Sequence, residues 1–287
     1  MRSKQTAEQG VHLIFLLCGI VSVAFVLFIS AYLIVSGIPA IRAIGLKEFL
    51  FGTVWSAGTQ QFGILPFILT SFYGTAGAVL LGVPVGIFTA VYLSKAAPRG
   101  AAAVIHTAVE LLAGIPSVVY GLVGMIVLVP GIQKLFHLSS GACLFSAILV
   151  LAIMILPSII GVSETALRAV PPEYEEGSLA LGATKMETWF RVSVRAARSG
   201  IVTSVVLGIG RAIGEAMAII MVSGNVANMP SLFSSVRFLT TAIASEMSYA
   251  AYGSLQRQAL YSIGLVLFLF IMLINAFLNT VVKRKGG

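Results

Sequence analysis

Residues 171–198 read PPEYEEGSLALGATKMETWFRVSVRAAR, and this charged segment decides how the rest of the chain must be arranged. It carries four of the chain's ten acidic residues and stands between two strongly apolar stretches, Leu144–Gly161 and Ile201–Val222. The apolar stretches predict helices buried in hydrocarbon, and the charges between them predict a folded connection in water. We call residues 171–198 the charged island.

The composition of the whole chain favours a membrane protein. Of 287 residues, 58% are hydrophobic and 10% are charged, and the mean hydropathy is +1.02. A soluble domain of this length needs more polar side chains to cover its core. A helix needs about 20 apolar residues to cross the hydrocarbon of a bilayer. We expect an all-α integral membrane protein with six spans, at Val11–Gly37, Pro66–Leu93, Leu111–Pro130, Leu144–Gly161, Ile201–Val222 and Ala259–Val282.

The distribution of Lys and Arg predicts the orientation of these spans. With a cytoplasmic N terminus, twelve basic residues lie in cytoplasmic segments and five lie in external segments. Basic residues near span ends stay on the cytoplasmic side. Both termini and the charged island are therefore expected in the cytoplasm. The formal net charge of +8 then reflects membrane topology and not a surface for nucleic acid.

The spans divide the chain into parts. We expect a cytoplasmic tail at 1–10, a first transmembrane helix at 11–37 and an external interfacial segment at 38–65. A five-helix core follows at 66–282, with a cytoplasmic loop at 162–198, and a basic cytoplasmic tail ends the chain at 283–287.

Residue spacing within the charged island predicts two short helices joined by a turn. Pro171 and Pro172 suit the start of a helix, and Gly182 can adopt the left-handed conformation that ends one. Thr184 and Glu187 have the Thr-x-x-Glu spacing of a capping box. A second helix is therefore expected directly after the turn.

The order Glu176-Gly-Ser-Leu-Ala-Leu-Gly182 resembles the EAA loop of ABC-importer permeases, where Glu is followed by two small residues, three variable ones and Gly. In that family the loop docks on a separate ATPase subunit and couples ATP hydrolysis to the membrane helices. The resemblance implies a coupling loop that includes Glu176, Gly177, Ser178, Gly182, Thr184 and Glu187. The chain departs from the family pattern at Arg195, where the family has proline.

Longer stretches resemble the PstC-type permease of phosphate ABC importers: Phe51–Trp55, Phe62–Pro66, Glu110–Gly121 and Gly210–Ile219. The resemblance implies a type I ABC-importer permease fold and a non-catalytic subunit that forms half of a phosphate pathway. It implies three partners: a PstB-like ATPase that binds the ATP, a PstA-like sister permease, and a PstS-like binding protein that is periplasmic or lipid-anchored. The implied location is the cytoplasmic membrane of a bacterium or archaeon, and no cofactor is expected on this chain.

Two charges fall inside the fifth predicted span. Arg211 and Glu215 are four residues apart, so on a continuous helix they share a face and can pair. Charges in hydrocarbon face the interior of a bundle or an aqueous path. Arg211 therefore either meets a transported anion, with Glu215 moderating its charge, or forms a structural ion pair with Glu215.

Several function classes lack the residues they need. The chain has no Gly-x-x-x-x-Gly-Lys-Ser/Thr loop for ATP, no spacing typical of metal ligands, and no catalytic nucleophile beside a base. We therefore expect no catalytic residue and no metal site. Two alternatives stay open: an ABC permease for another oxyanion such as sulfate or molybdate, and a secondary transporter or channel, which would leave the EAA-like loop without a use.

Overall fold

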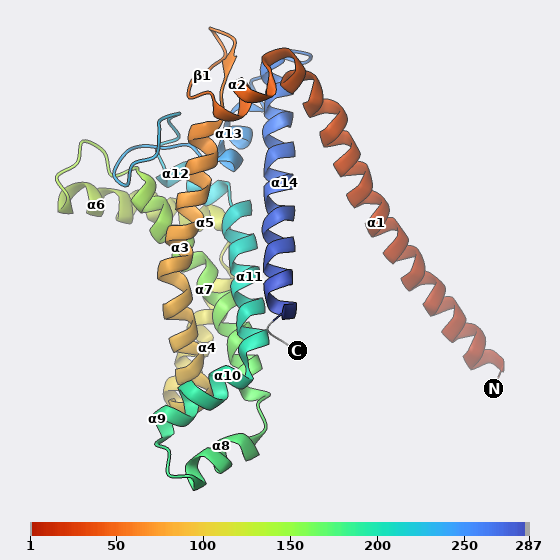
Figure 1. Cartoon of the computed structure of the whole chain (residues 1–287), viewed down its shortest axis with the longest axis vertical. Coiled ribbons are helices and arrows are strands. Elements are labelled where there is room, and N and C mark those ends of the chain that lie inside the picture. Colours follow the sequence, from red (N-terminus) through yellow and green to blue (C-terminus); the bar gives the residue numbers. More distant parts are fainter. Residues whose placement is uncertain (1, 285–287) are drawn as a thin grey trace.

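The computed structural model of the chain describes residues 2–284, with side chains described for residues 12–276. Long helices run alongside one another, the charged island lies at one end, and a small β-hairpin lies at the other (Figure 1). Within the described residues, five helices are long and apolar enough to cross a membrane. A sixth span forms only if Lys185–Ala196 and Arg198–Gly214, which are bent by 72° relative to each other, are taken together. The predicted all-α membrane architecture is confirmed.

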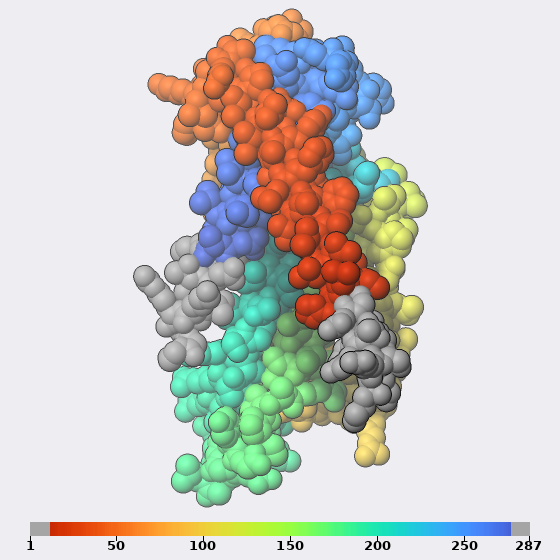
Figure 2. All heavy atoms as spheres, turned by 90° about the vertical axis from the view of Figure 1, so that its right-hand side faces the viewer, coloured from red at the N-terminus to blue at the C-terminus, as the bar shows by residue number. Residues whose placement is uncertain are grey.

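The first helix, α1 (Arg2–Ile44), is longer than the span predicted at 11–37. It starts within the expected tail 1–10 and ends only before Gly45, whose left-handed φ of +90° turns the chain. Its most apolar window is not buried by the rest of the chain. The helix diverges from the bundle in Figure 1 and crosses the near face of the molecule in Figure 2. Its surface is therefore available to lipid or to another helix.

The expected external segment 38–65 is folded. After α1 come a short helix, α2 (Leu46–Phe51), and the antiparallel strands β1 (Trp55–Ser56) and β2 (Gln61–Phe62). The Trp55 ring packs against Phe62 and Phe67, with ring centroids 5.1 and 5.5 Å apart. These aromatic contacts fix the hairpin to the start of α3 (Leu65–Val91).

The third span differs from the prediction. Helix α3 continues into a π-helical turn, η1 (Tyr92–Ala96), and is followed by α4 (Arg99–Gly114), α5 (Ser117–Val123), η2 (Gly124–Leu128) and α6 (Val129–Leu135). The expectation of one continuous helix over Leu111–Pro130 is wrong, because the chain is extended at Ile115 and Pro116. Proline has no amide hydrogen and disfavours the helical conformation of the residue before it. The apolar span begins at Ser117.

The fifth span is also interrupted. After α7 (Leu144–Arg168), the charged island forms α8 (Pro172–Ala180), α9 (Lys185–Glu187), η3 (Thr188–Ser193) and α10 (Val194–Ala196). The next helices are α11 (Arg198–Gly214), α12 (Met217–Val222), α13 (Leu239–Glu246) and α14 (Leu255–Arg284). The expected continuous helix Ile201–Val222 is wrong, because Glu215 is extended (ψ 132°) and Ala216 is not helical. Of the predicted basic tail 283–287, residues 285–287 lie outside the described residues.

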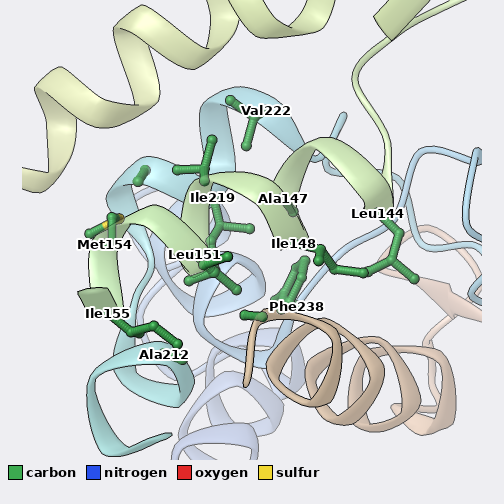
Figure 3. Packing of buried hydrophobic residues seen from close by; sticks show 14 of the residues in the cluster. Leu144, Ala147, Ile148, Leu151, Met154, Ile155, Ala212, Ile219, Val222 and Phe238 are labelled. Atoms are coloured by element: carbon green, nitrogen blue, oxygen red, sulfur yellow. The ribbon is translucent and has the colours of Figure 1, made fainter. Parts of the chain in front are cut away.

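The core forms where α7 packs against α3, α11 and α12. Leu151, Ile155 and Ile159 of α7 are fully buried, and Figure 3 shows α7 side chains meeting Ala212, Ile219 and Phe238. Glycines on α3 allow the close approach: a Cβ atom at Gly82 would lie 2.8 Å from Ile155 Cδ1 and 3.1 Å from the Ala152 carbonyl oxygen. Small residues at such contacts hold membrane helices together through van der Waals packing.

We expect Gly82→Leu to destabilise the fold by about 1–3 kcal/mol, because the added side chain must displace Ile155 or separate α3 from α7. The measurement is the thermal unfolding of the detergent-purified protein. Gly161→Leu is the matched control, since Gly161 lies on α7 with open space around it. Equal melting temperatures for the two variants would contradict the packing account.

Candidate functional site

Helices α5 and α12 each begin directly after a break in the helical backbone, and the two helices lie beside each other. The first break, at Ile115–Pro116, separates α4 from α5, and the second, at Glu215–Ala216, separates α11 from α12. Helices α5 and α12 pack closely, since a Cβ atom at Gly121 would lie 2.9 Å from Ala218 Cα. Membrane transporters commonly place binding sites where helices are interrupted.

Side chains satisfy backbone groups at both breaks. The Tyr120 hydroxyl donates a 2.6 Å hydrogen bond to the Leu112 carbonyl and so bridges α4 and α5. At the second break, the Thr240 hydroxyl donates to the Glu215 carbonyl at 2.7 Å. These bonds stabilise non-helical backbone where no water is available to replace the lost helical partners.

Arg211 lies one turn before the second break and is half-buried. Within the described part of the chain its guanidinium makes no ion pair and no hydrogen bond, and its charge acts over distance on Tyr120. A half-buried guanidinium without a carboxylate keeps its capacity to bind an anion. Among the described residues, Arg211 is therefore a charged side chain near the second break whose hydrogen-bonding capacity is unused.

Of the two alternatives for Arg211, the ion pair with Glu215 is not formed in the described part of the chain. Because α11 ends at Gly214, Glu215 does not occupy the next turn of the same helix. Its carboxylate instead accepts a 3.0 Å hydrogen bond from the backbone amide of Ala218. Negative charge at a helix start is favourable, so Glu215 caps α12 and leaves Arg211 uncompensated.

The cytoplasmic loop has the predicted local geometry. Gly182 is left-handed, with a φ of +86°, and it follows the last turn of α8. Thr184 and Glu187 form the capping box at the start of α9, and these hydrogen bonds from the Thr184 backbone and side chain lower the pKa of Glu187. Glu176 and Gly177 are exposed on α8, and the Ser178 hydroxyl lies 3.0 Å from Thr188 Oγ1, which joins α8 to η3.

The turn also presents apolar side chains to the solvent. Leu181, directly before Gly182, is 91% exposed, and Tyr174, Leu179 and Met186 are exposed on the same loop. An exposed apolar group rimmed by charges is typical of a protein interaction surface. The loop therefore has the form of a docking element.

One ion pair that the sequence did not predict links this loop to the membrane helices. Lys95 Nζ, in the π-helical turn after α3, lies 2.5 Å from Glu175 Oε1 on α8. The Ser193 hydroxyl donates to the same oxygen at 2.8 Å. Burial favours the neutral acid, but these hydrogen bonds and the Lys95 charge outweigh it and hold the pKa of Glu175 below its ordinary value. The pair crosses a long sequence separation, so no local spacing could reveal it.

A second unpredicted cluster joins α4 to α7. Buried Glu164 accepts from Arg168 Nη2 at 2.7 Å and lies 3.1 Å from His106 Nε2. The i,i+4 spacing of Glu164 and Arg168 is a signal that the sequence contains, whereas the contact with His106 depends on how α4 packs.

The external charges Arg237 and Glu246 form a cluster of their own. Arg237 pairs with Glu246, whose carboxylate also accepts hydrogen bonds from Trp55 and Gln256. Arg237 further donates to the Asn225 carbonyl at 2.8 and 3.0 Å. These bonds join the hairpin, α13 and α14. The hydrogen-bond donors of Arg237 are therefore used within the fold.

Most of the chain is similar in sequence to known transport proteins. Residues 82–286 match the family described as binding-protein-dependent transport system inner membrane component. The probable ABC transporter permease protein YqgH of Bacillus subtilis is 39% identical, covering 96% of this chain and 92% of the relative. The phosphate transport system permease protein PstC of Haemophilus influenzae is 35% identical, covering 99% and 94%. A probable PstC of Methanocaldococcus jannaschii is 31% identical over 89% of this chain.

The fold has relatives of known structure. A chain of the MetNI methionine ABC transporter in an inward-facing conformation superposes with a TM-score of 0.58 at 20% identity, covering 78% of this chain and 94% of that one. The family match spans most of the chain, and the relatives align over nearly their full length. The chain therefore belongs to the binding-protein-dependent transport system inner membrane components, as a multi-pass permease of the PstC type in the cytoplasmic membrane.

Proposed function

We propose that the chain is the permease subunit of an ATP-driven phosphate importer and forms half of its translocation pathway. The observation that carries the proposal is Arg211, a half-buried guanidinium without a carboxylate partner beside two interrupted helices. A guanidinium matches the oxygen geometry of phosphate through two parallel hydrogen bonds. The PstC relatives, whose names state phosphate transport, support this choice of anion.

Transport requires binding that is weak enough for release. In our proposal Arg211 attracts the anion, while the helix breaks allow α5 and α12 to move relative to α4 and α11. Glu215 acts by holding the start of α12 through the Ala218 amide, and not by neutralising Arg211. This modifies the role that the spacing of the two residues suggested.

ABC permeases work with an ATPase and a binding protein. We propose that this chain carries no cofactor, that a PstB-like ATPase binds the ATP, and that a PstA-like sister permease and a PstS-like binding protein complete the importer. The loop at 162–198 docks on the ATPase through the turn around Gly182, where Leu181 is exposed. The Lys95–Glu175 ion pair then passes the movement of α8 to α3.

The anion is tested by reconstituting the chain with its ATPase, sister permease and binding protein in vesicles. We expect ATP-dependent uptake of labelled phosphate that an excess of sulfate or molybdate does not suppress. Uptake of one of these oxyanions in place of phosphate would select the alternative of another oxyanion permease. Uptake that needs no ATPase would select a secondary transporter or channel.

We expect Arg211→Ala to lower phosphate uptake by about 100-fold, because a charge-assisted pair of hydrogen bonds to the anion is lost. Arg211→Lys retains the charge but not the planar pair of donors, so its uptake should be intermediate. Lys134→Ala, at an exposed position on α6, is the control for lost positive charge. The measurement is uptake by reconstituted vesicles with equal amounts of assembled complex. Normal uptake by Arg211→Ala would refute the pathway role.

We expect Gly182→Val to abolish co-purification of the ATPase, because a β-branched residue does not tolerate the left-handed conformation that orients Leu181. Gly253→Val is the matched control, since Gly253 is also left-handed, with a φ of +77° and open space around it, but lies in the loop before α14 at the other end of the molecule. The amount of ATPase retained on the affinity-tagged permease is measured. Equal retention in the two variants would contradict docking at this turn.

The Lys95–Glu175 pair is tested by charge reversal. We expect Lys95→Glu and Glu175→Lys each to lower uptake by roughly 10-fold, and the double variant to recover most of it, because the swapped charges attract again. Glu173→Lys, on the exposed face of α8, controls for the charge change. ATPase retention should stay normal throughout. If the losses of uptake in the two single variants simply add up in the double variant, the two residues do not act through a direct ion pair.

A further inference from the structure

A polar pocket of about 320 Å³ lies between α1 and α14 near their external ends. Its polar walls are Tyr32 and Ser36 of α1, Tyr252 from the loop before α14, and Arg257, Gln258 and Tyr261 of α14. Figure 1 shows the two helices meeting at this end and separating below it, and Figure 2 shows the loop before α14 beside the upper part of α1. Its lining includes neither Arg211 nor any residue of the two helix breaks.

Arg257 brings a positive charge to this pocket without a neutralising acid. No ion pair is formed by Arg257 within residues 12–276, and its Nε atom is buried with no hydrogen-bond partner. One terminal nitrogen donates to the Ala250 carbonyl at 3.2 Å, and the guanidinium lies 5.3 Å from the Tyr252 ring centroid. Arg237, by contrast, is paired with Glu246 on the same side of the membrane. A buried donor without a partner is costly unless a ligand completes its surroundings.

Hydroxyl groups face the same space. Tyr32 donates to the Tyr261 hydroxyl at 3.1 Å, and the two rings meet edge to face with centroids 5.5 Å apart. Tyr261 accepts this bond, so its own proton can be donated to a third group. An arginine with adjacent hydroxyl donors and no carboxylate is suited to an anion with several oxygen acceptors.

The surroundings of the pocket fit the depth of a lipid headgroup. Phe28 and Phe25 lie four and seven residues before Tyr32, on the same face of α1, and Phe28 is 69% exposed. Met272 lies eleven residues after Tyr261 on the same face of α14 and is 56% exposed. Apolar surface therefore extends from the pocket toward the membrane centre on both helices, where acyl chains would lie.

We propose that this pocket binds a phosphate group, with Arg257 as its cation and the hydroxyl of Tyr261 as a further donor. The group can belong to a phospholipid headgroup of the outer leaflet or to free inorganic phosphate. The pocket does not include Arg211, so this proposal does not rest on the proposed transport function. Bound phospholipid would fix α1 to α14 at the point where the two helices separate.

The test compares phosphorus occupancy in the wild-type chain, purified with its co-expressed partner subunits in phosphorus-free detergent, with that of Arg257→Gln. Native mass spectrometry counts retained phospholipids, and equilibrium dialysis of delipidated protein measures labelled inorganic phosphate. We expect Arg257→Gln to lower the occupancy by about tenfold, because a charge-assisted hydrogen bond is lost. Arg42→Gln is the matched control, since Arg42 is exposed in the last turn of α1 and outside the pocket.

Tyr261→Phe provides a second variant that keeps the ring and removes only the hydroxyl, and we expect about a threefold loss. A lipid signal that these variants lose identifies a headgroup as the source, and a dialysis signal that they lose identifies inorganic phosphate. The proposal is overturned if both variants keep wild-type occupancy in both measurements, as when a partner subunit fills the pocket with its own side chains. Uptake activity does not enter either readout, so failure here leaves the transport proposal standing.

Discussion

The arrangement of this protein depends on one requirement of the bilayer: every backbone amide and carbonyl in hydrocarbon must find its partner within the protein. Most of the chain meets it with long helices. At Ile115–Pro116 and Glu215–Ala216 the helices stop, and side chains of Tyr120, Glu215 and Thr240 supply the hydrogen bonds. The requirement makes such breaks costly, and these side chains offset part of that cost. Arg211 lies one turn before the second break, and in our proposal it attracts the anion there.

Close packing of α7 against α3, α11 and α12 surrounds the second break with a buried core. Helix α7 is buried against α3. Gly82 and Gly86 of α3 leave room for the Ile155 and Ile159 side chains of α7 to lie directly against the α3 backbone. After the end of α3, the π-helical turn η1 meets the charged island, where Lys95 pairs with Glu175 and Ser193 donates to the same carboxylate. In our proposal, movement of the island reaches α3 through this ion pair. The capping box and the left-handed Gly182 fix the local conformation of the turn within the island.

Local patterns predicted much of this architecture. Apolar length gave the membrane spans, and the spacing of Thr184 and Glu187 gave the start of α9, because both signals depend on neighbouring residues. The predictions for the third and fifth spans were wrong for the same reason, because each apolar stretch was expected to form one continuous helix. Pro116 carried a local warning of the first break, whereas Glu215 and Ala216 did not, since neither residue opposes helix formation strongly. The second break depends on Thr240 and on the packing of α12 against α5.

By itself, the sequence determined a multi-pass helical protein with a charged cytoplasmic loop between two spans and an arginine within an apolar stretch, because hydrophobic length, charge distribution and caps act over a few residues. The tertiary structure alone decided which charges are neutralised. Arg237 finds Glu246, and Lys95 finds Glu175 across a long stretch of chain, while Arg211 and Arg257 have no carboxylate partner within the described residues. Pairing of charges depends on distances in space that the folded bundle sets. The residues free to bind an anion can therefore be identified only after the fold is known.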